Sequence, residues 1–154
     1  LLAARGADVE ARTINGQSPL HLAASSSGED VFHLLLDIGA RIEVRDDVGR
    51  APIHLAAEKG HLVKIRLLVD CGAEVDARTA DRRTPLHLAV RCCQEVAVRL
   101  LLSAGADAGA RTVDGKTLLN VVDEEMKTSE DPERWQRIRT MLVEAGSEDD
   151  VGRI

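Results

Sequence analysis

Short apolar segments recur along this chain at a fixed interval, separated by polar turns. Three seven-residue segments stand 33 residues apart, at 18–24, 51–57 and 84–90. In each segment a proline is followed by an aliphatic residue, a histidine and a leucine. Ser18-Pro19 and Thr84-Pro85 suit the N-cap and first position of a helix. The hydroxyl of the N-cap residue can accept a hydrogen bond from a free backbone N–H of the first turn, and a proline at the first position sacrifices no helical hydrogen bond. The pattern therefore predicts a short helix at the start of each repeat.

A second, more apolar segment follows each short helix after a polar break. Its hydrophobic residues lie at helical spacing and predict a helix with a wide apolar face, which is expected to include Val31, Cys71 and Val96. A Gly-Ala pair follows each second helix, and a glycine there suits the left-handed residue that ends many helices. These glycines keep the 33-residue step and are Gly39, Gly72 and Gly105.

Two independent markers that share one phase are typical of a solenoid, in which each repeat buries its apolar face against its neighbours. The segment 84–89, Thr-Pro-Leu-His-Leu-Ala, resembles the Thr-Pro-Leu-His-x-Ala pattern of the ankyrin repeat. The resemblance implies an all-α ankyrin-repeat α-solenoid, with helix-turn-helix pairs joined by β-turn fingers. The repeat phase predicts about four units plus a partial N-terminal unit.

The repeat phase also predicts the domain organisation. We expect a single ankyrin-repeat domain over residues 1–154, and Leu1 and Leu2 match the end of a second helix, which indicates a fragment of a longer array. The expected parts are a partial unit at 1–12, full units at 13–45, 46–78 and 79–111, a divergent C-terminal capping unit at 112–146 with an insertion near 126–133, and an acidic tail at 147–154.

The last unit departs from the repeat pattern. Its glycine marker is delayed to Gly146, and a new helix is expected to begin after Asp131. Trp135, Ile138 and Leu142 are expected to form the apolar face of that helix and to close the stack. We expect the acidic residues after Gly146 to fray.

Composition narrows the class of protein. The chain contains one Phe, one Trp and no Tyr, which suits a solenoid without a central core. The net charge of −6 and the few aromatic residues argue against nucleic acid or an anionic membrane as the partner. Three cysteines without metal-ligand spacing indicate a reducing compartment, so we expect an intracellular, cytoplasmic protein, with the nucleus as the alternative.

The sequence does not predict catalysis or a bound cofactor. His21, His54 and His87 recur in phase and are expected to form a column, which raises the hypothesis of a metal site. Their spacing follows from the architecture, however, and the resemblance implies that they tie neighbouring fingers together by hydrogen bonds. We therefore expect no metal site, no cofactor and no enzyme activity in this chain.

Basic residues recur at the predicted fingers. Arg12, Arg45, Arg78 and Arg111 share the 33-residue step, and a second basic row follows five residues later in the chain. These rows are either a basic surface for an acidic segment of the partner or ordinary solvated finger residues. Arg82 stands where the other units have glycine, so its finger must place a side chain in a turn that favours glycine.

The resemblance implies a monomeric protein–protein interaction module that presents a concave surface of fingers and inner helices to a partner protein. The alternatives are a structural spacer or a regulatory arm within a larger signalling protein, channel or enzyme. Taken over by repeat position, the expected partner-binding residues are Arg12, Asn15, Gln17, Ser25, Ser26, Arg45, Asp47, Val48, Arg50, Glu58, Lys59, Arg78, Ala80, Asp81, Arg83, Arg91, Cys92, Arg111 and Lys116.

Overall fold

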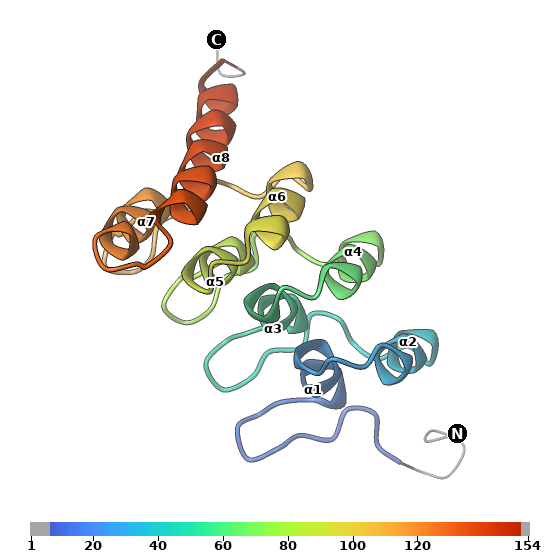
Figure 1. Cartoon of the computed structure of the whole chain (residues 1–154). Coiled ribbons are helices and arrows are strands. Elements are labelled where there is room, and N and C mark those ends of the chain that lie inside the picture. Colours follow the sequence, from blue (N-terminus) through green and yellow to red (C-terminus); the bar gives the residue numbers. More distant parts are fainter. Residues whose placement is uncertain (1–6, 152–154) are drawn as a thin grey trace.

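Stacked helix pairs make up the part of the chain that the structure describes (Figure 1). The computed structural model describes the backbone of residues 7–151 and the side chains of residues 7–146. Within that part, the helices in chain order are α1 (Pro19–Ser25), α2 (Asp30–Asp37), α3 (Pro52–Lys59), α4 (Leu62–Asp70), α5 (Pro85–Arg91), α6 (Glu95–Ser103), α7 (Leu118–Met126) and α8 (Pro132–Val151). The predicted all-α fold is confirmed.

The helices form two rows that run side by side in Figure 1. The inner row consists of α1, α3, α5 and α7, and each of these helices contacts the next one in the row. The outer row consists of α2, α4, α6 and α8, each packed against its inner partner. The loops that lead into α3 and α5 project from the inner row as fingers. This arrangement is the expected solenoid.

The repeated motif explains where each inner helix begins. Its proline occupies the first position of α1, α3 and α5. The backbone N–H of each preceding N-cap residue donates to Nδ1 of the motif histidine, at 3.1 Å for Ser18, 3.0 Å for Ala51 and 3.1 Å for Thr84. In α7, where the histidine is lost, the Thr117 N–H donates to Oδ1 of Asn120 at 2.9 Å. The predicted helix starts are therefore confirmed.

Left-handed residues follow most of the helices, as the glycine markers predict. The residues after the outer helices have φ values of 83°, 91° and 91° at Gly39, Gly72 and Gly105. Gly60 follows α3 with φ of 70°, and Cys93 follows α5 with φ of 53°. Helix α1 differs, because its C-cap residue Ser26 is extended, with φ of −78° and ψ of 160°.

The core lies between the two rows. It is built from aliphatic and small residues, with Phe32 fully buried at the centre of the first helix pair. Three residues expected on the apolar faces are instead exposed: Val31 at 55%, Val96 at 58%, and Cys71. Each outer helix turns only one side toward the inner row, and these residues lie on the other side, so the apolar faces are narrower than predicted.

The C-terminal helix pair packs on the third unit, with α7 against α5 and α8 against α6. The Arg134 N–H donates to Oδ1 of Asp131 at 3.1 Å, which confirms the predicted start of α8. Trp135, Ile138 and Leu142 are buried, as expected. The prediction for Gly146 is wrong, because α8 continues through it to Val151. No proline interrupts the chain from 133 to 151, so the helix can extend into the acidic segment that we expected to fray. Leu1 and Leu2 lie outside the described residues.

Candidate functional site

Each finger is a tight turn closed by a side chain at its base. In the second finger, Oδ1 of Asp46 accepts the N–H groups of Val48 at 3.1 Å and Arg50 at 2.8 Å. In the third finger, Oγ1 of Thr79 accepts the Arg83 N–H at 3.0 Å. Short Asp and Thr side chains favour such turns because they can bond to the backbone two to four residues further on. The fingers are therefore defined locally by their own sequence.

Backbone hydrogen bonds join each finger to the next. The Asp47 N–H donates to the Asn15 carbonyl at 3.1 Å, and the Ala80 N–H donates to the Val48 carbonyl at 3.1 Å. The Val113 N–H continues the series, donating to the Asp81 carbonyl at 3.0 Å. The fingers consequently form a continuous strip beside the inner row rather than independent loops.

The column of finger arginines lies along this strip and bonds to its backbone. Nη1 of Arg12 donates to the Arg45 carbonyl at 2.5 Å, and Nη1 of Arg45 donates to the Arg78 carbonyl at 3.4 Å. Nη1 of Arg78 donates to the Arg111 carbonyl at 3.4 Å. Each guanidinium thus connects two successive fingers. These arginines stabilise the strip, in addition to any contact they make with a partner.

The second basic row is paired with acids of the same chain. Nε of Arg50 lies 2.8 Å from Oδ2 of Asp46, and its Nη1 lies 4.0 Å from Oε2 of Glu58. Burial raises the pKa of Asp46, but the hydrogen bonds from the Arg50 N–H and guanidinium outweigh it and leave that pKa below its usual value. In the next unit, Nε of Arg83 lies 2.9 Å from Oδ2 of Asp81.

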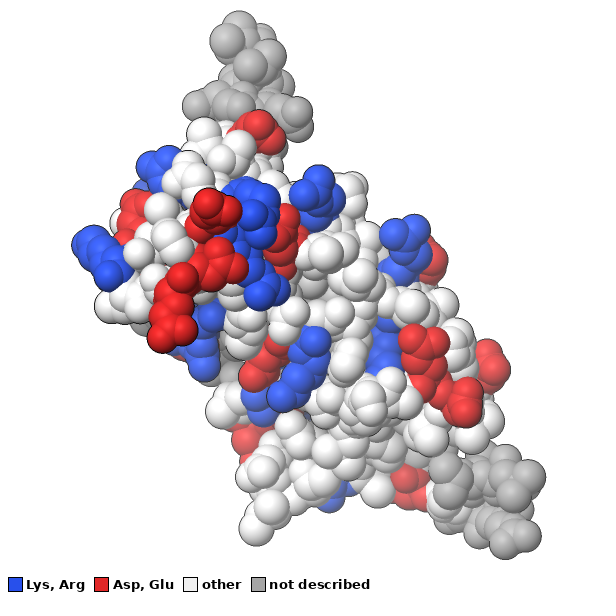
Figure 2. All heavy atoms as spheres, in the orientation of Figure 1, with Lys and Arg blue, Asp and Glu red and all other residues white. Residues whose placement is uncertain are grey.

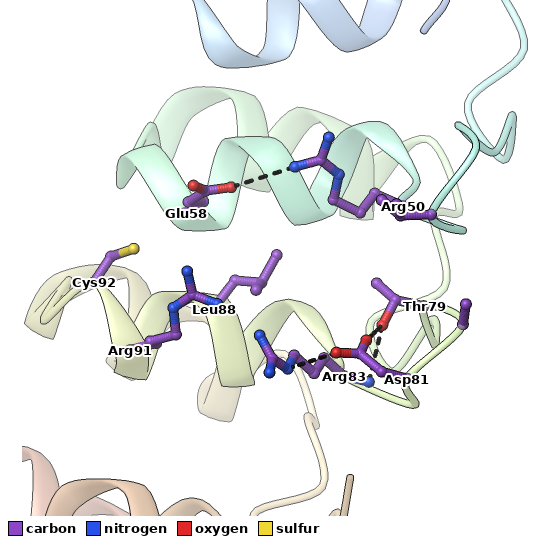
Figure 3. Close-up of a pocket in the computed structure, with 10 residues that line it drawn as sticks. Arg50, Glu58, Thr79, Asp81, Arg83, Leu88, Arg91 and Cys92 are labelled. Carbon is purple, nitrogen blue, oxygen red and sulfur yellow. Dashed lines mark hydrogen bonds and ion pairs between the residues drawn. The ribbon is translucent and has the colours of Figure 1, made fainter. Parts of the chain in front are cut away.

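A groove of about 340 Å³ lies between α3, α5 and the second and third fingers (Figure 3). Leu88 of α5 lies at its floor and is almost fully buried. Val48 and Ala80 line its finger side, and Cys92 lies at the opposite end. The complete lining consists of Val48, Arg50, Glu58, Thr79, Ala80, Asp81, Arg83, Leu88, Arg91 and Cys92.

The three arginines of the groove differ in whether they form an ion pair. Arg50 and Arg83 have the acidic partners described above, whereas Arg91 forms no ion pair with any residue in the described part of the chain. In Figure 3 the Arg91 side chain extends from α5 into the space between α5 and α3. The lining therefore carries three arginines against two acids, Glu58 and Asp81, and Arg91 is the arginine without an ion pair, although it also borders a neighbouring pocket lined by Asp114, Glu124 and Glu125.

The comparisons with known proteins agree with this architecture. Residues 20–112 match the family model for ankyrin repeats, in three copies. The chain belongs to the ankyrin-repeat family. Ankyrin repeats are in general protein–protein interaction modules and are typically non-catalytic. No curated protein matches this chain. Among the residues that the structure describes, no helix is both long and apolar enough to cross a membrane.

The groove brings together part of the residue set expected for partner binding. Eight of those residues line it: Val48, Arg50, Glu58, Ala80, Asp81, Arg83, Arg91 and Cys92. Sequence reasoning missed Thr79 and Leu88, which also line it. The motif gave no signal for Leu88, because leucine also occupies this position in the other two units and its exposure differs between them, from 46% at Leu22 to 4% at Leu55.

The other expected residues lie elsewhere on the ankyrin stack. Arg12, Asn15 and Gln17 belong to the first finger, away from the groove. The hydroxyls of Ser25 and Ser26 donate to carbonyls of α1, at 3.0 Å each. Arg45, Arg78 and Arg111 belong to the finger column, and Asp47 lies in the second finger, where its N–H bonds to the first finger. Lys59 lies at the exposed end of α3, and Nζ of Lys116 lies 3.3 Å from Oε2 of Glu124.

The histidine column is part of the ankyrin scaffold. Nε2 of His21 lies 2.8 Å from the Arg50 carbonyl, and Nε2 of His54 lies 2.9 Å from the Ala77 carbonyl. Nε2 of His87 is buried without a hydrogen-bond partner among the described residues. Burial lowers the pKa of His54 and of His87 to about 4, so both are neutral at physiological pH. Within residues 7–146, no group of three or more potential metal ligands occurs.

The third ankyrin unit contains two residues in the left-handed region that are not glycine. Arg82 has φ of 63° at the fingertip, as its position among glycines predicts, and Cys93 has φ of 53° after α5. In the second finger a Cβ on Gly49 would lie 2.8 Å from the Ala80 nitrogen, which explains why glycine is needed there. Backbone strain of this kind costs on the order of 1 kcal/mol at each residue.

Proposed function

We propose that this ankyrin-repeat domain binds a protein partner over the concave surface formed by its fingers and inner helices, with the groove between α3 and α5 at the centre. The location of the groove supports this proposal most strongly. It lies where two fingers and two inner helices meet, and it combines a buried apolar floor with polar side chains at its rim. Such a combination is typical of binding sites in folded proteins.

The rigidity of the surface also supports binding. The fingers are joined through backbone hydrogen bonds and through the arginine column, so a partner would meet a strip that is already ordered. A preorganised surface loses little conformational entropy when the complex forms. Several units can therefore contribute to one interface at a small entropic cost.

The distribution of charge favours a protein over a polyanion. Figure 2 shows acidic and basic side chains interspersed over the visible face of the stack, without a continuous basic band. The chain as a whole carries a net charge of −6. Binding to nucleic acid depends mainly on neutralising phosphates with clustered basic residues. We therefore propose a protein partner, bound by a monomer.

A matched pair of substitutions tests the proposed surface. Val48 on the second finger is 53% exposed and Val96 at the start of α6 is 58% exposed, so arginine can replace either without filling the core. We expect Val48→Arg to abolish recovery of a partner in an affinity-capture screen with the whole chain, and Val96→Arg to leave it unchanged. A partner retained by Val48→Arg and lost with Val96→Arg would place the interface on the outer row instead.

A further inference from the structure

We infer that the groove between α3 and α5 binds an extended segment of the partner that carries a carboxylate side chain for Arg91 and, about three residues away, an aliphatic side chain for the finger end. This inference rests on the proposed function, because it assigns a chemistry to the partner at that surface. Three observations carry it: the unpaired guanidinium, the apolar wall, and the distance between them.

The charge of the groove selects an acidic group. Arg50 is held by Asp46 and Glu58, and the only acid close to Arg83 in the groove is Asp81. Arg91 has no ion-pair partner among the described residues, and its side chain points from α5 into the space between α5 and α3 in Figure 3. A carboxylate from the partner would compensate this charge. Arg91 is exposed at the rim of the groove, where a charge pair contributes mainly to specificity and to the rate of association.

The surroundings of Cys92 place a second cation near that end of the groove. Burial and the Glu58 carboxylate raise the pKa of the Cys92 thiol, while Arg91 and Lys59 lower it. Lys59 ends α3 and Arg91 ends α5, so two basic side chains flank the Cys92 end. Glu58 is the only acid of the lining on that side, and it already faces Arg50. An acidic residue of the partner is therefore favoured at this end.

The finger end selects an apolar side chain. Val48 and Ala80 lie side by side there, because the Ala80 N–H donates to the Val48 carbonyl. Val48 is half-exposed, and Leu88 forms the floor beneath. An aliphatic side chain that covered these three residues would remove their remaining apolar surface from water.

The length of α5 sets the spacing between the two side chains. Six helical steps separate Pro85, beside the third finger, from Arg91 at the end of α5. At about 1.5 Å per helical residue, this span is roughly 9 Å. A segment in the extended polyproline II conformation advances about 3.1 Å per residue and completes a turn every three residues, so side chains three positions apart lie on the same side and about cover the distance. The expected pattern is an aliphatic residue and an Asp or Glu three positions apart, with two residues between them. Either one can come first in the sequence.

The finger arginines do not offer an equivalent site. Each of them already donates to at least one backbone carbonyl of the finger strip, so a partner carboxylate would have to compete with that bond. Arg91 has no such bond among the described residues. The acidic specificity of the domain is therefore expected to depend on Arg91 rather than on Arg78 or Arg111.

Selection from a random linear peptide library on immobilised 154-residue chain tests this inference. We expect the enriched peptides to carry an Asp or Glu three positions from an aliphatic residue, and a synthetic peptide of that kind to bind Arg91→Glu at least about tenfold more weakly. Selection on Arg91→Glu should instead enrich Lys or Arg at the same position. Arg66→Glu is the matched control, because Arg66 is an exposed arginine of α4 on the outer row.

The outcomes separate this inference from the proposed function. If Arg91→Glu selects peptides with the same acidic pattern, or if the enriched peptides carry no acidic residue, the assignment of Arg91 is wrong. Groove binding itself would still stand if Val48→Arg abolishes binding of those peptides. Failure to enrich any peptide would also overturn the inference of an extended segment. Peptides whose binding survives Val48→Arg and is lost with Val96→Arg would contradict the proposed surface itself.

Discussion

Lys64 of α4 caps the preceding inner helix by donating from Nζ to the Ala23 carbonyl oxygen at 2.6 Å. The same ammonium group donates to the Ser26 carbonyl and lies 5.5 Å from the centre of the Phe32 ring. Only 1% of Lys64 is exposed. Helix α1 lacks the left-handed residue that follows α3 and α5, and its last turn is closed instead by the Ser25 and Ser26 hydroxyls and by Lys64. The second unit therefore contributes part of the cap of the first.

Replacing Lys64 with methionine should therefore destabilise the domain. The change keeps most of the buried volume but removes the Lys64 donor from the Ser26 carbonyl and leaves the Ala23 carbonyl with the Ser26 hydroxyl alone, at an expected cost of about 2 kcal/mol in the free energy of unfolding. Urea titration followed by circular dichroism measures the change. Lys59→Met on the exposed end of α3 is the control and should have little effect. Equal stability of the two variants would refute the capping role.

Restoring the missing hydroxyl at the start of α3 should stabilise the domain. Oγ1 of Thr84 lies 2.9 Å from Nδ1 of His87, whereas Ala51 has no equivalent atom beside His54. We expect Ala51→Thr to raise the free energy of unfolding by about 0.5–1 kcal/mol, the usual contribution of an N-cap. Because Ala51 is buried, Ala51→Val controls for the added bulk. A thermal midpoint for the Thr variant no higher than that of the Val variant would count against the hydroxyl.

The two deeply buried histidines predict a loss of stability in mild acid. Burial lowers the pKa of His54 and His87 from 6.5 to about 4 in the folded state. The unfolded chain therefore binds more protons between these values, and stability falls as the pH decreases through that range. From neutral pH to about pH 5, each histidine should cost roughly 2 kcal/mol.

Asparagine, which α7 uses at the equivalent position, allows this pH dependence to be assigned. His54→Asn should reduce the difference in unfolding free energy between neutral pH and about pH 5, whatever its effect at neutral pH. The exposed His33 provides the control variant, His33→Asn, which should keep the wild-type difference. If both variants keep the wild-type difference, His54 is not a source of the acid sensitivity.

The finger arginines should contribute to stability as well as to the charge of the surface. Arg45 donates to the carbonyls of Gly49 and Arg78 and lies 3.8 Å from Glu74 of the next unit. We expect Arg45→Met to lower the free energy of unfolding by about 1 kcal/mol, because hydrogen bonds between two fingers are lost. Arg66→Met on the outer row should change it by less than about 0.5 kcal/mol. No effect at Arg45 would indicate that the column is solvated.

The sequence could predict the repeat architecture because its markers act locally. Proline and histidine at the start of an inner helix, and glycine after an outer helix, fix backbone geometry within a few residues, and the structure keeps them in those roles. The extent of α8 was not predictable in this way. Gly146 occupies a marker position, but glycine permits a left-handed turn without requiring one, and the helix continues.

The pairings between units could not be predicted from the sequence. The motif position of Arg91 indicated a surface residue, but only the structure shows that Arg50 and Arg83 have acidic partners and that Arg91 has none among the described residues. The hydrogen bonds of Lys64 could not be predicted from the sequence either, because the carbonyl groups that accept them lie 38 and 41 residues earlier in the chain. Such contacts depend on how one unit stacks on the next.

Hydrogen exchange with and without a bound partner or selected peptide tests most directly whether binding occurs over the groove. Binding is expected to slow amide exchange in the second and third fingers and along α3 and α5, around Val48, Ala80 and Leu88. The outer helices α2, α4 and α6 should exchange at unchanged rates. Protection confined to the outer row, with the fingers unchanged, would contradict binding at the concave surface.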